Sequence, residues 1–175
     1  MKDLNKWTRI NIITTGGTIE KTYDENDGTL FNRETVIKKK LNDKLRLPYT
    51  EIVISSLMSI DSLDMDLEHR QKILYKITDL IEQEKAPVVI LHGTDTMQMT
   101  AEYVKSELIN PEVPILFTGA MKPLGFDDSD ALQNVTEALI AAQILSAGVY
   151  ISFHNRIYEI PGARKNKGMG TFEQF

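Results

Sequence analysis

The sequence predicts an α/β fold, a three-layer α/β/α sandwich around a mainly parallel sheet. Three observations lead to this prediction. Short, β-branched apolar runs recur along the chain, each is followed by a loop of small polar residues, and helical apolar patterns separate them. Buried strands of a parallel sheet are apolar on both faces, as these runs are. At 175 residues the chain can bury a core of useful size, and we expect residues 1–175 to form a single domain.

Five apolar runs are the expected strands, and four segments are the expected helices. The strands are Ile10–Ile13, Ile52–Ile54, Val88–Leu91, Val113–Phe117 and Val149–Phe153. The helices are Leu67–Glu84, Thr96–Leu108, Asp130–Ser146 and a shorter one, Glu34–Leu41. In the longest helix the apolar residues keep a 3.6-residue period, and Pro87 marks its end. Because connections between parallel strands are right-handed, this alternation predicts a flavodoxin- or Rossmann-like sheet covered by helices.

Composition argues against several classes of function. The chain has no cysteine, which excludes disulfides, thiolate nucleophiles and cysteine-ligated metals. Its three histidines lack the spacing of metal ligands, and no Gly-x-Gly-x-x-Gly run is present, so we expect no metal and no other cofactor. The net charge of -5 argues against nucleic acid as a partner, and the basic run Lys38–Lys40 is typical of a solvated helix face.

The apolar segments are too short to enter a membrane. No run approaches the ~20 apolar residues that a membrane helix needs. The first residues, Met1–Lys6, lack the apolar core of a signal peptide. We therefore expect a cytoplasmic protein without a membrane partner.

Small polar residues cluster in the loops that follow the expected strands. These loops are Thr14–Thr18, Ser55–Asp66, His92–Thr96 and Thr118–Asp128. In open α/β sheets, ligands bind at the carboxyl ends of the strands. The four loops therefore predict the position of a ligand site.

Two of these loops carry threonines next to glycines. In the first, Gly16 and Gly17 allow a sharp turn with hydroxyls on either side, which fits a functional site, a phosphate cradle or a simple tight turn. In the third, Thr94, Asp95 and Thr96 lead into a helix, where they can be an N-cap and a dipole-favoured acid. The same helix end suits a substrate carboxylate and Asp95 suits an α-ammonium group, which favours an amino-acid ligand.

A threonine nucleophile needs a partner that accepts its proton. A lysine can serve when burial or neighbours lower its pKa, and Lys165 and Lys167 lie in the tail after the last expected strand. Tyr23, five residues after Thr18, is another possible partner or a packing aromatic. Of the histidines, we expect His69 on the surface and His92 in a structural role, while both roles stay open for His154.

Four motifs carry a family resemblance. They are Thr15-Gly16-Gly17-Thr18-Ile19, Ser62-Leu63-Asp64-Met65, His92-Gly93-Thr94-Asp95-Thr96-Met97 and Thr118-Gly119-Ala120-Met121-Lys122-Pro123. In this order, over most of the chain, they resemble the N-terminal domain of the bacterial-type L-asparaginase/glutaminase family. The resemblance implies hydrolysis of L-asparagine to L-aspartate and ammonia, without a cofactor.

The resemblance also implies catalytic roles. Thr18 corresponds to the threonine that attacks the side-chain amide carbon, and Tyr23 corresponds to a flap tyrosine that assists it. A second group consists of Thr94, Asp95 and a lysine near the end of the domain. We assign that lysine to Lys165, which directly follows an arginine as in many relatives, although its spacing from the preceding glycine favours Lys167.

Substrate-binding roles follow from the same resemblance. Ser62 is similar to the serine that holds the substrate carboxylate, and backbone groups near Ala120 resemble those that meet the scissile amide. Backbone N–H groups of the first loop, which contains the substrate-binding candidate Gly17, and of the Thr94 region can stabilise the oxyanion. Leu63 stands where the long enzymes have a polar contact, usually glutamine, and Asp61 is our candidate to replace it.

Length is a second departure from the long enzymes, which continue into a C-terminal domain that supplies an acidic residue to a neighbouring subunit's site. We therefore expect the short, single-domain form, assembled as a homo-oligomer, a dimer or tetramer. Three alternatives stay open: a glutaminase, the amidase subunit of a tRNA-dependent amidotransferase, and a non-catalytic amino-acid-binding module.

Overall fold

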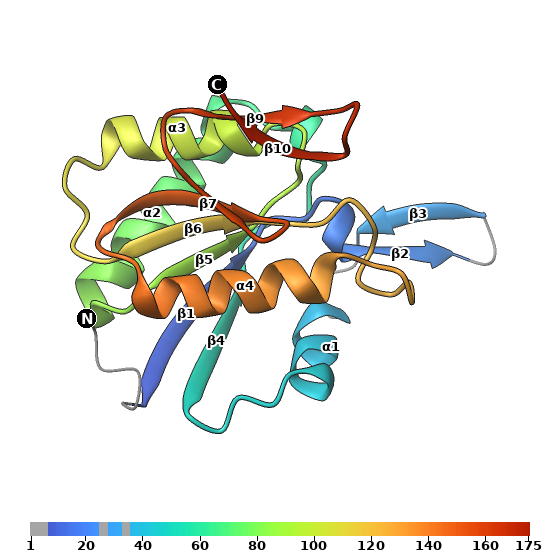
Figure 1. Ribbon diagram of the computed structural model, residues 1–175, viewed down its shortest axis with the longest axis horizontal. Coiled ribbons are helices and arrows are strands. Elements are labelled where there is room, and N and C mark those ends of the chain that lie inside the picture. The colour runs from blue at the N-terminus through green and yellow to red at the C-terminus, as the bar shows by residue number, and fades with distance from the viewer. Residues whose placement is uncertain (1–6, 25–27, 33–35) are drawn as a thin grey trace.

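A six-stranded sheet forms the central layer of the protein, with strand order β4-β1-β5-β6-β7-β8 (Figure 1). The structure is a computed structural model that describes residues 7–24, 28–32 and 36–175. The strands are β1 (Thr8–Thr14), β4 (Thr50–Ser56), β5 (Val88–Leu91), β6 (Pro114–Thr118), β7 (Gly148–Phe153) and β8 (Arg156–Glu159). The first five run parallel, and β8 alone pairs antiparallel, with β7. The predicted mainly parallel sheet is confirmed.

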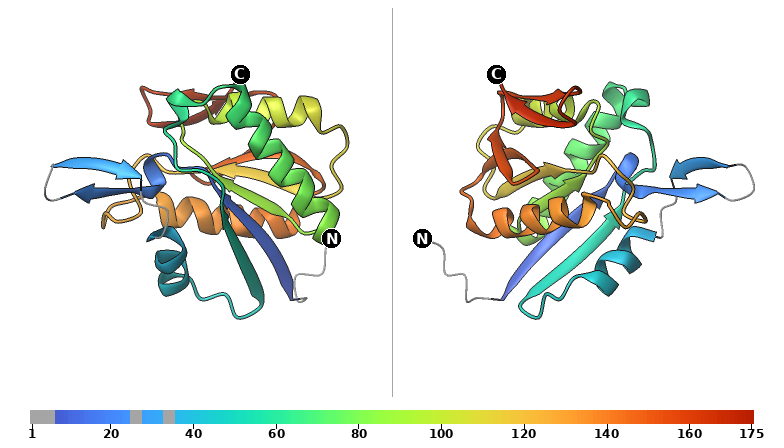
Figure 2. Two further views of the ribbon diagram at one scale, coloured as in Figure 1. Left: turned by 180° about the vertical axis from the view of Figure 1, so that it is seen from behind. Right: turned by 45° about the vertical axis from the view of Figure 1, so that its right-hand side comes forward.

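Helices cover both faces of this sheet and complete the three layers (Figures 1 and 2). Helices α2 (Leu67–Glu84) and α3 (Met97–Glu107) lie on one face, and α1 (Val36–Lys44) and α4 (Ala131–Ile144) lie on the other. Each coincides with an expected helix, although the expected start of the short one, at Glu34, lies outside the described residues. The predicted α/β/α sandwich is therefore confirmed.

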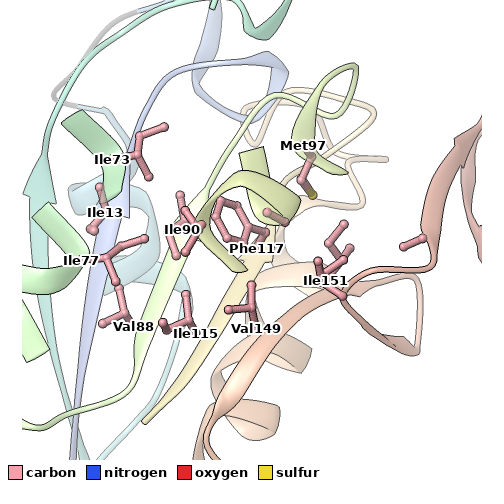
Figure 3. Packing of buried hydrophobic residues seen from close by; sticks show 14 of the residues in the cluster. Ile13, Ile73, Ile77, Val88, Ile90, Met97, Ile115, Phe117, Val149 and Ile151 are labelled. Atoms are coloured by element: carbon pink, nitrogen blue, oxygen red, sulfur yellow. The ribbon is translucent and has the colours of Figure 1, made fainter. Parts of the chain in front are cut away.

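Side chains that point alternately to the two faces of the sheet divide the core into two apolar clusters. On β1, β5 and β6, Ile13, Ile90 and Phe117 point toward α2 and α3 (Figure 3), and all three are fully buried. Their neighbours Ile12, Val89 and Leu116 belong to the cluster on the α1 and α4 side. Successive side chains of a strand point to opposite faces, so strands covered on both sides must be apolar at every position. This requirement explains the continuous apolar runs of the sequence.

The strand order sets the position of a crevice. From β1 the chain crosses to β4 on one side and then returns to β5 on the other side of β1. Loops that leave neighbouring strands in opposite directions open a crevice at the carboxyl end of the sheet, where ligands of such folds bind. The loops that follow β1 and β5 are the two threonine loops, so the topology brings them to the same crevice.

Two hairpins and one strand were not predicted. The hairpin β2 (Lys21–Asp24)–β3 (Thr29–Asn32) extends beyond the sheet, and β9 (Ala163–Asn166)–β10 (Thr171–Gln174) lies beside α3 (Figure 1). The expectation that the chain after Phe153 is a tail is wrong, because it forms β8, β9 and β10. Their short charged segments hide three buried anchors, Tyr158, Ala163 and Phe172, which join the α2–α3 cluster.

Candidate active site

Three loops meet backbone to backbone at the carboxyl end of the sheet. A Cβ on Gly17 would lie 2.5 Å from Cα of Gly93, and a Cβ on Gly16 would lie 2.4 Å from N of Ile60. Gly16 and Gly17 also have φ values of 95° and 82°, which side chains rarely adopt. Any other residue at these two positions would have a strained backbone, and its Cβ would clash with the neighbouring loop. The result places Thr18 and Thr94, each the residue after such a glycine, on adjoining loops.

The hydroxyl of the nearby Thr15 is used in a hydrogen bond within the protein. Its Oγ1 donates to Leu91 O at 2.9 Å, and the residue is fully buried. Thr15 thus attaches the first loop to β5. Thr18 is half-buried at the start of a short 3-10 turn, Thr18–Glu20. Of the three threonines in the loop Thr14–Thr18, Thr14 and Thr15 are buried, and only Thr18 is partly exposed.

Ser62 presents a buried and unsatisfied hydroxyl to the same region. The residue is 1% exposed, and its Oγ has no hydrogen-bond partner among the described residues. A Cβ on Gly93 would lie 2.6 Å from this Oγ, so the hydroxyl packs directly on the second threonine loop. Thr96 Oγ1 donates to Ser62 O at 2.7 Å and fixes the backbone there. A buried polar group without a partner is costly, so this hydroxyl is suited to a ligand.

Lys165 lies against Thr94 and Asp95. Its Nζ is 2.7 Å from Thr94 Oγ1 and 3.0 Å from Asp95 Oδ1. The Lys165 and Asp95 side chains are 15% and 32% exposed, and Thr94 is 3% exposed. Residues 70 and 71 positions apart therefore form one compact hydroxyl, carboxylate and ammonium group.

The hairpin β9–β10 explains why Lys165 and not Lys167 reaches this group. Lys165 pairs with Phe172 and lies two residues from buried Ala163, on the same side of the strand. Lys167 lies beyond the end of β9 and is exposed. The choice of Lys165 thus agrees with the contacts, while its role in catalysis stays a prediction.

Tyr23 lies apart from the Thr94 group. It is on β2 and is 60% exposed, and it lines a shallow cavity with Lys21, Pro123 and Phe126. From its polar sequence we predict that the segment Tyr23–Gly28 is poorly ordered without ligand, and its residues 25–27 lie outside the described residues.

Asp61 has two protein partners instead of an open carboxylate. Its Oδ2 is 2.8 Å from Lys21 Nζ, and its Oδ1 accepts a hydrogen bond from Leu63 N at 3.1 Å. The Lys21 ammonium and the Leu63 N–H hold the pKa of Asp61 below its usual range. Leu63 itself is 69% exposed and contributes no polar side chain. Lys21 is a charged neighbour of the site that the motifs did not indicate.

The loop after β6 closes another side of the site. Ala120 is buried, and a Cβ on Gly119 would lie 2.3 Å from His92 O. Met121 Sδ is 3.7 Å from Thr94 Oγ1, a contact that the sequence did not suggest. The Gly17 N–H, expected to face the oxyanion, donates instead to Ile60 O at 3.1 Å. The contribution of Gly17 observed here is close packing.

His92 has a structural environment. Its ring is fully buried, and Nδ1 is 2.8 Å from Gly93 O, which requires this nitrogen to carry the proton. Burial lowers the pKa of His92 to about 4.

Within residues 7–24, 28–32 and 36–175, no group of acidic and histidine side chains could hold a metal ion. No helix in the same part of the chain is long and apolar enough to cross a membrane.

Solved structures with this fold define its class. The thermostable L-asparaginase from Thermococcus kodakarensis superposes with a TM-score of 0.86 and 25% identity, over 96% of this chain and 51% of that one. L-asparaginase I from Vibrio cholerae gives 0.85 and 27%, over 95% and 51%. The fold is therefore that of one half of an L-asparaginase chain.

The family follows from the sequence match. Residues 9–174 match the family described as Asparaginase, N-terminal. The chain belongs to this asparaginase family, as its four motifs predicted.

Curated relatives carry a different name, that of a glutamyl-tRNA(Gln) amidotransferase subunit. The relative from Haloquadratum walsbyi is 30% identical over 83% of this chain. The relative of the same name from Methanococcus vannielii is 32% identical over 85%. The chain spans 33% and 34% of the lengths of these relatives.

Proposed function

We propose that this protein hydrolyses the side-chain amide of L-asparagine to give L-aspartate and ammonia. The observation that supports it best is the contact of Lys165 with both Thr94 and Asp95, beside a loop that offers Thr18. A threonine nucleophile requires a proton acceptor and an oriented substrate, and these residues are of the types that supply both.

In the proposed reaction, Thr18 Oγ1 attacks the side-chain amide carbon. The C–N bond breaks, and ammonia leaves with the proton that came from the threonine hydroxyl. Water then hydrolyses the resulting ester, which releases L-aspartate and restores Thr18. Thr94 and Lys165 are suited to relay protons in both steps, and Tyr23 assists once the β2–β3 hairpin approaches the substrate.

Substrate binding uses the remaining polar groups. The unsatisfied Ser62 hydroxyl suits the α-carboxylate, and Asp95 suits the α-ammonium group. Backbone near Ala120 lies beside the scissile amide. Correct orientation of this kind supplies a large share of catalysis in amide hydrolysis.

Glutamine is the competing substrate. The curated relatives favour it, because their name is that of an amidotransferase subunit for glutamyl-tRNA(Gln). In that alternative the chain would be the amidase subunit of a larger amidotransferase assembly. As a homo-oligomer in the cytoplasm, which we expected from the sequence, it would act alone on free asparagine.

Ammonia release by the purified protein tests the proposal. We expect turnover of asparagine that disappears in Thr18→Ala, and a higher kcat/KM for asparagine than for glutamine. Equal rates for wild type and Thr18→Ala would reject the nucleophile. Preference for glutamine would support the amidotransferase alternative, and calorimetric binding of asparagine without turnover would support a binding module.

A further inference from the structure

We propose that Asp130, His154 and Thr171 form a bridge that positions Lys165 against Thr94. The catalytic consequence of this bridge rests on the function proposed above, whereas its structural consequence does not. None of the three residues belongs to the four motifs. They join the loop after β6 to the β9–β10 hairpin, and Met121 of that loop and Lys165 of that hairpin both contact Thr94.

Asp130 is the first part of the bridge. It occupies the N-cap position of α4, yet its side chain makes no cap hydrogen bond to that helix. The carboxylate instead accepts hydrogen bonds from Met121 N and Lys122 N, each at 3.0 Å, and from Asn134 Nδ2 at 2.9 Å. An N-cap aspartate ordinarily bonds the first turn of its own helix. Here the carboxylate serves the loop that carries Met121.

The charge of Asp130 suits this task. Burial by itself would raise its pKa, but the hydrogen bonds from Met121 N, Lys122 N and the His154 ring outweigh burial, and the pKa is lowered. An ionised carboxylate makes the stronger hydrogen bonds to backbone N–H groups.

His154 is the second part. Its Nε2 is 2.9 Å from Asp130 Oδ2, and its Nδ1 is 3.0 Å from Thr171 Oγ1. Since Nε2 faces a carboxylate, it carries a proton, and Nδ1 of the neutral ring then accepts a hydrogen bond from the Thr171 hydroxyl. In the imidazolium form Nδ1 donates to Thr171 instead. The bridge therefore persists in both forms of the ring.

The backbone around His154 is held as firmly as the ring. His154 N donates to Asn134 Oδ1 at 3.0 Å, and Asn134 Nδ2 donates to Gly119 O at 3.0 Å. The His154 ring also packs on Phe153, with 4.4 Å between ring centroids. The turn is consequently attached to both α4 and the loop after β6.

Thr171 is the third part, and it fixes the hairpin beside the lysine. Thr171 pairs with Asn166, and the next pair of the hairpin is Phe172 with Lys165. Lys165 Nζ reaches Thr94 Oγ1 at 2.7 Å, and the same hydroxyl contacts Met121 Sδ at 3.7 Å. Both ends of the bridge thus converge on Thr94. A displacement of Thr171 would move Lys165, and a displacement of Met121 would open the other side of the hydroxyl.

Three substitutions and the chemical reactivity of Lys165 test the bridge. Thr171→Val removes the hydroxyl, Thr171→Ser keeps it, and His154→Asn removes the ring. Asparagine tolerates the left-handed turn at His154, where φ is 45°. Reductive methylation followed by mass spectrometry would measure the methylation rate of Lys165 relative to that of Lys167. Lys167 is exposed and serves as the internal reference.

We expect the methylation rate of Lys165, relative to Lys167, to rise about fivefold in Thr171→Val and His154→Asn, as for loss of one hydrogen bond. The kcat for asparagine should fall about 10-fold or more because small misplacements of catalytic groups are costly. KM should change little, and Thr171→Ser should behave as wild type in both measurements.

An unchanged labelling ratio in His154→Asn and Thr171→Val would overturn the bridge, as would a Thr171→Ser variant as impaired as Thr171→Val. A variant with a lower Tm but a normal ratio would show a purely structural role and also overturn it. If the wild type releases no ammonia, the proposed function fails, while the labelling ratio still decides on the bridge.

Discussion

The two sides of the candidate site differ in how completely the folded chain assembles them. On the Thr94 side, Lys165, Asp95 and Thr94 contact one another, and only a small part of this group is exposed. On the Thr18 side, Tyr23 is 60% exposed on a hairpin that extends from the body of the molecule (Figure 1). The Thr94 side is therefore assembled in the free protein, as the proposed proton relay requires. For the Thr18 side we propose that β2–β3 moves toward a bound ligand before Tyr23 can take part.

Replacement of Lys165 should have the largest effect on turnover. Lys165→Met keeps the apolar stem but removes the ammonium group from Thr94 and Asp95. We expect kcat for asparagine to fall by about 10²–10⁴-fold, the range for loss of a general acid–base group. Lys167→Met, two residues away and exposed, is the matched control and should keep full activity. Equal losses in the two variants would contradict the preorganised side as described.

The buried His92, next to the Thr94 loop, makes the unfolding free energy of the protein dependent on pH. Its pKa is about 4 in the folded protein, against 6.5 for the ordinary group. Between these values the unfolded chain binds more protons than the folded one, so the unfolding free energy decreases as pH falls. The shift corresponds to about 3 kcal/mol between pH 7 and pH 4.

Urea unfolding of wild type and His92→Gln at pH 7, 5.5 and 4 would measure this contribution. Asp61 and Asp130 also have lowered pKa values, and their loss of stability at low pH is common to both proteins. The unfolding free energy of wild type should therefore fall by about 3 kcal/mol relative to that of His92→Gln between pH 7 and pH 4. Curves that stay parallel would show that His92 keeps an ordinary pKa.

Removal of the Tyr23 hydroxyl tests the other side of the comparison. Because Tyr23 is exposed in the free protein, Tyr23→Phe should leave Tm and asparagine affinity almost unchanged. It should lower kcat by about 10²-fold if the hydroxyl contacts the reacting groups once the hairpin closes, as for loss of one transition-state donor. Steady-state kinetics with Tyr49→Phe as a control for an exposed tyrosine would decide. A Tyr23→Phe enzyme with normal kcat would remove Tyr23 from the mechanism.

The contrast between the two sides also marks what the sequence could predict. The strands that end in the threonine loops are apolar on both faces and were found from that pattern. The hairpin that carries Lys165 was missed because Arg164, Lys165 and Asn166 form a short charged strand with one buried residue before it. Its neighbour Lys167 could not be rejected without the pairing of Lys165 with Phe172.

Asp130 was hidden for a different reason. The sequence predicted Asp130 only as the first residue of a helix, and the structure has it one residue earlier, at the N-cap position of α4. Its actual partners are backbone groups eight and nine residues earlier and a histidine 24 residues later. Contacts of this kind depend on how loops meet in space, and no local pattern encodes them.

The Lys21–Asp61 pair lies at the junction of the two sides, and its removal should have the smallest effect. The pair joins the base of the β2–β3 hairpin to the Ser62 loop, with the side chains 25% and 35% exposed. Exposed ion pairs contribute about 0.5 kcal/mol, so Lys21→Met should barely change the unfolding free energy.

If Asp61 also contacts the substrate ammonium, Asp61→Asn should raise KM for asparagine well beyond the change in Lys21→Met. If Asp61 only anchors the hairpin, the two variants and their combination should give the same KM. Because Lys21 already occupies one carboxylate oxygen and Leu63 N occupies the other, we expect the second outcome. A selective rise in KM for Asp61→Asn would assign the residue to substrate binding and extend the preorganised side as far as the Ser62 loop.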